Sequence, residues 1–122
     1  MPHEYSIDSA QRLVRVRMWG ALTRTEILAT VAELVGDPRL SPDFSELIDV
    51  TDATAAEIHT DDIRAIAGAL LDRVARRAFV APDPAVFGLA RMFGAFRDMK
   101  DATEHVAVFR SIREAEEWLG LA

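Results

Sequence analysis

The sequence contains no cysteine, which excludes disulfide bonds, thiolate metal ligands and thiol catalysis. It also lacks any run of about 18 apolar residues, the length that a membrane-spanning helix needs. The first residues do not combine a basic flank with an apolar stretch, so no signal peptide is indicated. These absences together predict a cytoplasmic protein in a reducing compartment.

Positive charge is also in short supply, with 14 lysine and arginine residues against 20 aspartate and glutamate residues and a net charge of −6. An acidic surface repels the phosphate backbone, which disfavours a nucleic-acid partner. The six glycines are isolated and form no phosphate-binding loop, and the three histidines lack the spacing of a helical metal site. The sequence therefore predicts neither a cofactor nor a bound metal.

The chain has 122 residues, of which 50% are hydrophobic, and no linker or internal repeat divides it. This length suits one domain with its own core, so residues 1–122 are predicted to form a single unit. Residues 13–19 alternate between apolar side chains and arginines, the pattern of a strand with one solvent-exposed face. The segment 4–7 is expected to pair with this strand as an antiparallel hairpin.

Strand and helix patterns alternate along the rest of the chain. Capping boxes at Thr23 with Glu26 and at Ser111 with Glu114 predict the starts of two helices. Gly36 is expected to end the first helix in a left-handed conformation, and Asp83 with Pro84 to begin another. A further helix is predicted from Thr60, with the apolar stripe Ile63, Ile66, Ala67, Leu70 and Val74.

Interior strands are predicted at 46–50, 77–81 and 106–109. Such alternation implies parallel strands joined by helices, with the first strand antiparallel at an edge. We therefore predict an α/β fold with a mixed, mostly parallel sheet of about five strands and about four helices.

The last third of the chain carries a family resemblance. Residues 87–93 read Phe-Gly-Leu-Ala-Arg-Met-Phe, residues 106–111 read Val-Ala-Val-Phe-Arg-Ser, and residues 114–120 read Glu-Ala-Glu-Glu-Trp-Leu-Gly. With the strand at 47–50, these segments resemble the bacterial SpoIIAA-like proteins, which are similar to STAS and CRAL-TRIO domains. The resemblance implies a STAS-like, non-enzymatic domain that is frequently dimeric. It also implies candidate roles in binding small apolar ligands and in contacting membranes.

In STAS antagonists of anti-sigma factors, a serine at the start of the helix after the central strand is phosphorylated. Thr60 occupies that position here, but Asp61 and Asp62 replace the serine and glycine that follow it in the STAS pattern. A phosphate would gain from the helix dipole and be repelled by these two acids, which could instead mimic a permanent charge. With Asp52 and His59, these residues form our candidate partner-binding surface. The capping role of Thr60 is the alternative.

The helix after Pro84 carries more apolar residues than one buried face requires. Its aromatic and methionine side chains could line a ligand pocket, build a dimer interface, or touch a membrane beside Arg91 and Arg97; burial under a neighbouring helix is the alternative. The candidate pocket residues are Phe87, Met92, Phe93 and Phe96.

The sequence thus favours a regulatory or protein-interaction module without catalytic activity. The alternative is a carrier or sensor of a small apolar, lipid-like ligand, with peripheral membrane contact. A hard-cation site at Asp49, Asp52, Asp61 and Asp62 is a further alternative. An enzyme using these carboxylates with His59 is disfavoured, because no nucleophile, base and orienting group can be assembled.

Overall fold

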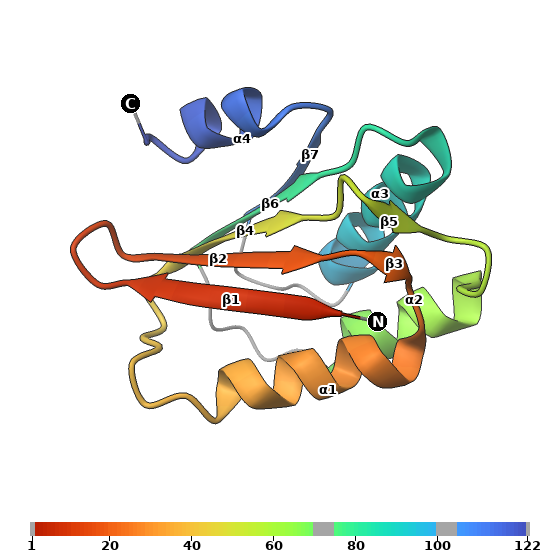
Figure 1. The fold of residues 1–122 in the computed structure, drawn as a ribbon, viewed down its shortest axis with the longest axis horizontal. Coiled ribbons are helices and arrows are strands. Elements are labelled where there is room, and N and C mark those ends of the chain that lie inside the picture. Colours follow the sequence, from red (N-terminus) through yellow and green to blue (C-terminus); the bar gives the residue numbers. More distant parts are fainter. Residues whose placement is uncertain (1, 70–74, 100–104, 122) are drawn as a thin grey trace.

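A computed structural model describes residues 2–69, 75–99 and 105–121 of the chain. Figure 1 shows strands and helices in alternation. The strands are β1 (His3–Asp8), β2 (Leu13–Met18), β3 (Gly20–Ala21), β4 (Ser45–Asp49), β5 (Ala53–Thr54), β6 (Arg76–Val80) and β7 (His105–Phe109). The helices are α1 (Arg24–Val35), α2 (Thr60–Ala69), α3 (Pro84–Met99) and α4 (Ile112–Trp118). The predicted stripe residues Leu70 and Val74 lie outside the described residues.

Five strands form one mixed sheet in the order β1-β2-β4-β6-β7. The edge strand β1 is antiparallel to β2, and the remaining neighbours are parallel. The predicted α/β class, the antiparallel first strand and the four helices are confirmed. Among the described residues, no helix is both long and apolar enough to cross a membrane.

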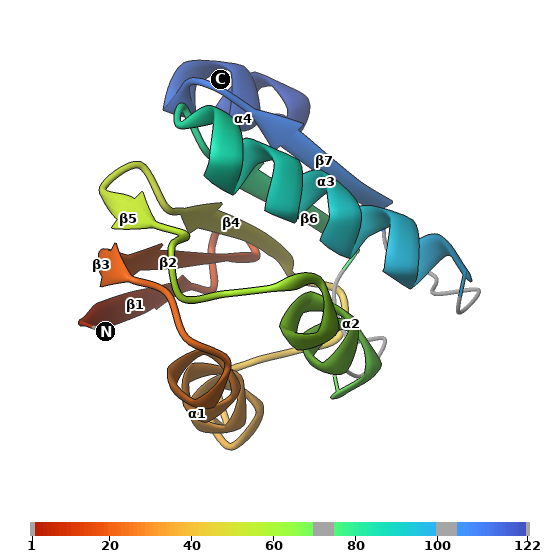
Figure 2. The same cartoon turned by 90° about the vertical axis from the view of Figure 1, so that its right-hand side faces the viewer.

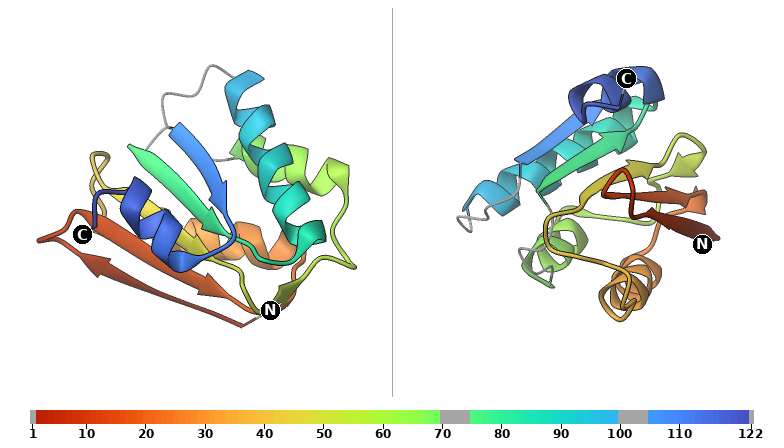
Figure 3. Two further views of the ribbon diagram at one scale, coloured as in Figure 1. Left: turned by 90° about the horizontal axis from the view of Figure 1, so that it is seen from above. Right: turned by 90° about the vertical axis from the view of Figure 1, so that its left-hand side faces the viewer.

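The two faces of the sheet carry separate hydrophobic layers. One face packs against α1, α2 and α3, and it receives Val14, Val16 and Ile48 from the central strands. Figure 2 shows α3 running along β6 and β7, with α1 and α2 beside each other. Figure 3 shows α4 on the opposite face of the sheet, where it packs against a smaller hydrophobic layer. That layer consists of Leu13, Leu47, Ala78, Val80 and Ala115.

Three helix starts follow the predicted capping chemistry. The hydroxyls of Thr23 and Ser111 accept hydrogen bonds from backbone N–H groups three residues on, at 3.4 and 3.2 Å. Asp83 likewise accepts from the N–H of Ala85 at the start of α3. The left-handed cap predicted at Gly36 is wrong, because this residue has a φ of −79°. Its N–H still bonds the carbonyl of Ala32 and closes the last turn in the ordinary helical region.

A second, two-stranded sheet of β3 and β5 extends the carboxyl ends of β2 and β4. Gly20 begins β3 with a φ of +82°, a conformation that favours glycine. The sequence analysis did not predict this small sheet, because two-residue strands carry no periodic pattern. It fixes the chain segment that leads from β4 towards α2.

Asp37 ties the loop after α1 to the edge of the sheet. Its carboxylate accepts hydrogen bonds from the Tyr5 hydroxyl at 2.9 Å and from the Arg39 guanidinium at 2.7 Å. The hydrogen bonds from Arg39 hold the pKa of Asp37 well below its ordinary value. The charged form of Asp37 is therefore the one that the folded state prefers.

Asp37→Asn is expected to destabilise the protein at neutral pH. Because the pKa of Asp37 is lower in the folded than in the unfolded state, its contribution is complete above about pH 4 and is lost as the pH falls further. The difference in urea midpoint between wild type and variant should shrink between about pH 7 and about pH 3. Asp61→Asn, at a side chain that is 89% exposed, is the matched control. A difference independent of pH would contradict this assignment.

Candidate functional site

An apolar cavity of about 130 Å³ lies between the sheet and the three helices α1, α2 and α3. Strands β2, β4 and β6 contribute alternate side chains to one wall, because residues two apart point to the same face. The apolar strand residues at this wall are Val16, Met18, Ile48 and Phe79, and Val50 follows directly after β4.

Helix α1 supplies much of the opposite wall through residues spaced by three or four positions. Ile27, Val31 and Leu34 lie on this side of the cavity. Val35 also lines it and is 47% exposed, so the wall reaches the molecular surface at the C-terminal end of α1. Leu40, in the loop that Asp37 fixes, lies at the wall as well.

Helices α2 and α3 complete the enclosure. Ile63 and Ile66 come from α2, and Val86, Ala90 and Phe93 come from α3. The Phe93 ring meets Phe79 of the sheet in an edge-to-face contact, with 5.3 Å between ring centres. This contact fixes the position of α3 over β6.

Three polar side chains interrupt the apolar lining: Thr30, Glu46 and Arg77. The Thr30 hydroxyl donates to the backbone carbonyl of Glu26 in the preceding turn of α1. Arg77 and Glu46 form an ion pair with 3.3 Å between Nε and Oε1, and their side chains are 4% and 12% exposed. The Arg77 guanidinium carbon lies 5.6 Å from the centre of the Phe93 ring. An almost wholly apolar cavity thus contains one largely buried pair of opposite charges.

The four candidate pocket residues of α3 lie in different surroundings. Phe93 lines the cavity, whereas Phe87, Met92 and Phe96 do not. Phe87 lies under the Arg110 guanidinium at 4.1 Å, and Phe96 lies under that of Arg64 at 5.1 Å. Met92 is half-buried against the same hydrophobic layer. Helical periodicity indicated an apolar stripe but not which part of it borders empty space.

The membrane contact predicted beside Arg91 and Arg97 is wrong for one of these residues. Arg97 is 1% exposed, and its guanidinium donates to the backbone carbonyl of Ala67 at 2.7 Å. A side chain buried between two helices cannot reach a membrane surface. Arg91 is exposed, and its contact with lipid stays a prediction.

The predicted partner-binding surface lies at the start of α2. Thr60 is the first residue of the helix rather than its cap, so the capping interpretation is wrong by one position. Asp62 accepts a hydrogen bond from the N–H of His59 at 2.9 Å and lies 3.4 Å from the Nε of Arg24. His59, Thr60 and Asp61 are exposed. The phosphoacceptor role of Thr60 and the binding of a partner here stay predictions.

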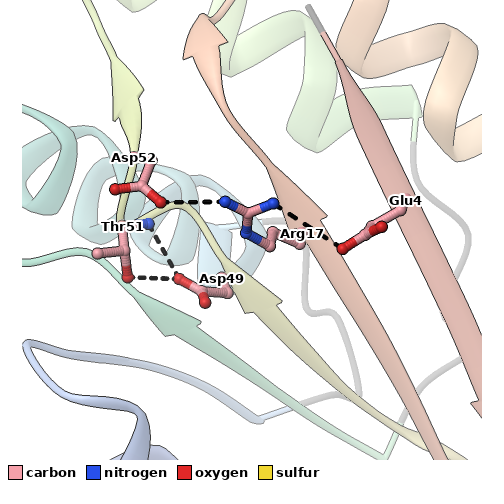
Figure 4. A network of polar contacts seen from close by, with 5 residues as sticks. All are labelled: Glu4, Arg17, Asp49, Thr51 and Asp52. Atoms are coloured by element: carbon pink, nitrogen blue, oxygen red, sulfur yellow. Dashed lines mark hydrogen bonds and ion pairs between the residues drawn. The ribbon is translucent and has the colours of Figure 1, made fainter.

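Asp52 belongs to a different network, at the carboxyl end of β4 (Figure 4). Its carboxylate lies 3.1 Å from the Arg17 guanidinium, which also approaches Glu4 at 3.9 Å. Asp49 accepts hydrogen bonds from the N–H and hydroxyl of Thr51. Asp61 pairs with Arg64 at 3.2 Å, so the four carboxylates of the predicted hard-cation site have separate partners. Within residues 2–69, 75–99 and 105–121, no three potential metal ligands come together.

Comparison with known proteins identifies the architecture. No family model and no curated protein sequence matches the chain. The chain is similar to the crystal structure of an uncharacterised DUF3478-family protein with a SpoIIAA-like fold from Shewanella loihica PV-4. The TM-score is 0.62 at 18% sequence identity, over 96% of this chain and 93% of that one. The predicted resemblance is confirmed at the level of architecture: the chain has a SpoIIAA-like fold.

Proposed function

We propose that this domain is a non-catalytic binding module that holds a small apolar molecule in the cavity between the sheet and α1, α2 and α3. The observation that carries the proposal is the cavity itself, about 130 Å³ in volume and lined almost entirely by aliphatic and aromatic side chains. Protein interiors are close-packed, and large unfilled spaces lose dispersion contacts and stability. A ligand of matching shape would restore those contacts.

The size and chemistry of the space limit what it can hold. An apolar cavity of about 150 Å³ accommodates benzene, so a ligand of one ring or a short branched chain is the expected scale. Transfer of hydrocarbon surface from water to apolar walls is favourable. The proposed ligand is therefore smaller than a phospholipid and enters with most of its surface buried.

A non-catalytic role agrees with the polar groups at the cavity. Glu46 and Arg77 neutralise each other, and the Thr30 hydroxyl donates to the backbone of its own helix. Among the described residues that line the cavity, none is a histidine or an unpaired hydroxyl next to a base. Such walls can bind and orient a molecule, and they offer no nucleophile and base for group transfer.

Filling the cavity with a side chain tests the proposal. Ala90→Leu adds apolar atoms at a buried position of the wall, so toluene binding measured by calorimetry should fall below detection. The melting temperature should be unchanged or higher, because the added atoms gain contacts without a ligand.

Ala95→Leu is the matched control, because Ala95 lies on the same helix and is exposed. It should bind toluene as the wild type does. Absence of toluene binding by the wild-type protein, or undiminished binding by a folded Ala90→Leu variant, would overturn the proposed function.

A further inference from the structure

We propose that the Glu46–Arg77 pair recognises one hydroxyl group, so that the ligand of the cavity is a small apolar alcohol or phenol. This inference rests on the proposed function, because it assigns the polar end of a molecule bound in the same cavity. The observation behind it is that Glu46 and Arg77 form an ion pair in a wall that is otherwise mostly apolar.

The pair is built into the centre of the sheet. Glu46 of β4 and Arg77 of β6 are directly opposite each other in the parallel register. Glu46 lies two positions before Ile48, and Arg77 lies two positions before Phe79. Because residues two apart in a strand point to the same face, Glu46 and Arg77 lie on the face that lines the cavity. Neighbouring strands hold the two side chains together, so little reorganisation is needed when a ligand arrives.

An ion pair in an apolar wall carries a desolvation cost. Removing two charges from water costs free energy that their attraction only partly returns, and hydrophobic residues of similar volume commonly stabilise a protein as well or better. Stability alone therefore gives no reason for this pair at the cavity. A role in recognising a ligand does give one.

The two groups match a hydroxyl in their hydrogen-bonding chemistry. A guanidinium carries five N–H donors and a carboxylate has several acceptor sites, so an ion pair retains capacity for a further partner. A hydroxyl oxygen can accept from Arg77 while its own hydrogen is donated to Glu46. An ether, which cannot donate, would satisfy only half of this arrangement.

Charge selects against other polar head groups. The pair is neutral overall, so a carboxylate ligand would introduce a net negative charge beside Glu46 in a low-dielectric wall. An ammonium group would place a net positive charge beside Arg77 for the same reason. A neutral hydroxyl adds no net charge, and Phe93 beside the guanidinium provides an apolar surface for the body of the ligand.

Phenol and toluene provide the test, because they have the same shape and differ only in a hydroxyl for a methyl group. Calorimetric titration of the wild-type protein should give a Kd for phenol that is no larger than the Kd for toluene. In Glu46→Leu/Arg77→Met, an apolar replacement of similar volume, toluene should be preferred by at least about tenfold, because a buried hydroxyl without a partner loses its hydrogen bonds. Benzoate should bind more weakly than phenol to the wild type.

Arg15→Met/Glu116→Leu is the matched control. This pair joins β2 to α4 at 2.6 Å, and neither residue lines the cavity. The phenol-to-toluene ratio should stay at its wild-type value in this variant.

The outcomes separate the two proposals. If the wild type binds neither compound, the proposed function fails, and this inference fails with it. If the wild type binds toluene and prefers it over phenol by tenfold or more, the cavity binds ligands but the hydroxyl site is overturned, whether or not the double variant folds. An unchanged ratio in a folded double variant would overturn it equally.

Discussion

Phe93→Ala is expected to lower the free energy of unfolding by about 3–5 kcal/mol, the largest effect of any substitution at the cavity. Phe93 is 4% exposed and contacts both Phe79 and the Arg77 guanidinium. Removing the ring eliminates its own buried surface and enlarges a space that is already incompletely filled. The surrounding helices and strands cannot collapse onto it without moving the whole sheet.

Urea unfolding of the two proteins measures this loss. Phe87→Ala is the matched control on the same helix, because Phe87 is only partly buried, stacks under Arg110 and does not line the cavity. Its loss should be clearly smaller. Equal losses for the two variants would show that Phe93 holds no special place in the packing of α3.

Arg97→Ala is expected to destabilise the protein by about 3 kcal/mol, which is unusual for an arginine. Surface substitutions typically change stability by about 0.5 kcal/mol or less. Arg97 is instead 1% exposed and donates to the backbone carbonyl of Ala67 in α2. Ala67 is also 1% exposed, so loss of the guanidinium removes a hydrogen bond from a charged donor in the interior of the protein.

Thermal and urea unfolding would both report this effect. Arg91→Ala, at an exposed position of the same helix, should be close to neutral. Arg97→Met should recover part of the loss, because it restores the aliphatic stem but not the hydrogen bond. If Arg97→Ala were as mild as Arg91→Ala, the link between α3 and α2 would contribute little.

Much of the fold could be predicted from local patterns. The alternation in β2 correctly assigned Val14 and Val16 to the core and Arg15 and Arg17 to a partly solvated face. Thr23 and Ser111 were identified as helix caps because capping chemistry involves residues only a few positions apart. Information of this kind is contained in a short window of sequence.

The cavity and its ion pair could not be predicted in the same way. Glu46 and Arg77 are far apart in sequence and meet only when β4 and β6 align in register. Likewise, the buried position of Arg97 depends on how α3 packs against α2. Incomplete packing is a property of three helices and a sheet together, so no apolar stripe on one helix reveals it.

The two hydrophobic layers of the molecule differ in one respect: only one of them borders the cavity. The layer under α4 is fully buried at its centre, where Ala78 and Ala115 have no exposed surface. It packs α4 against the sheet. The layer under α1, α2 and α3 has spare volume. Its side chains can therefore vary in size and shape while the layer under α4 stays unchanged. Substitutions that change the size or shape of the proposed ligand site can thus be confined to one side of the sheet.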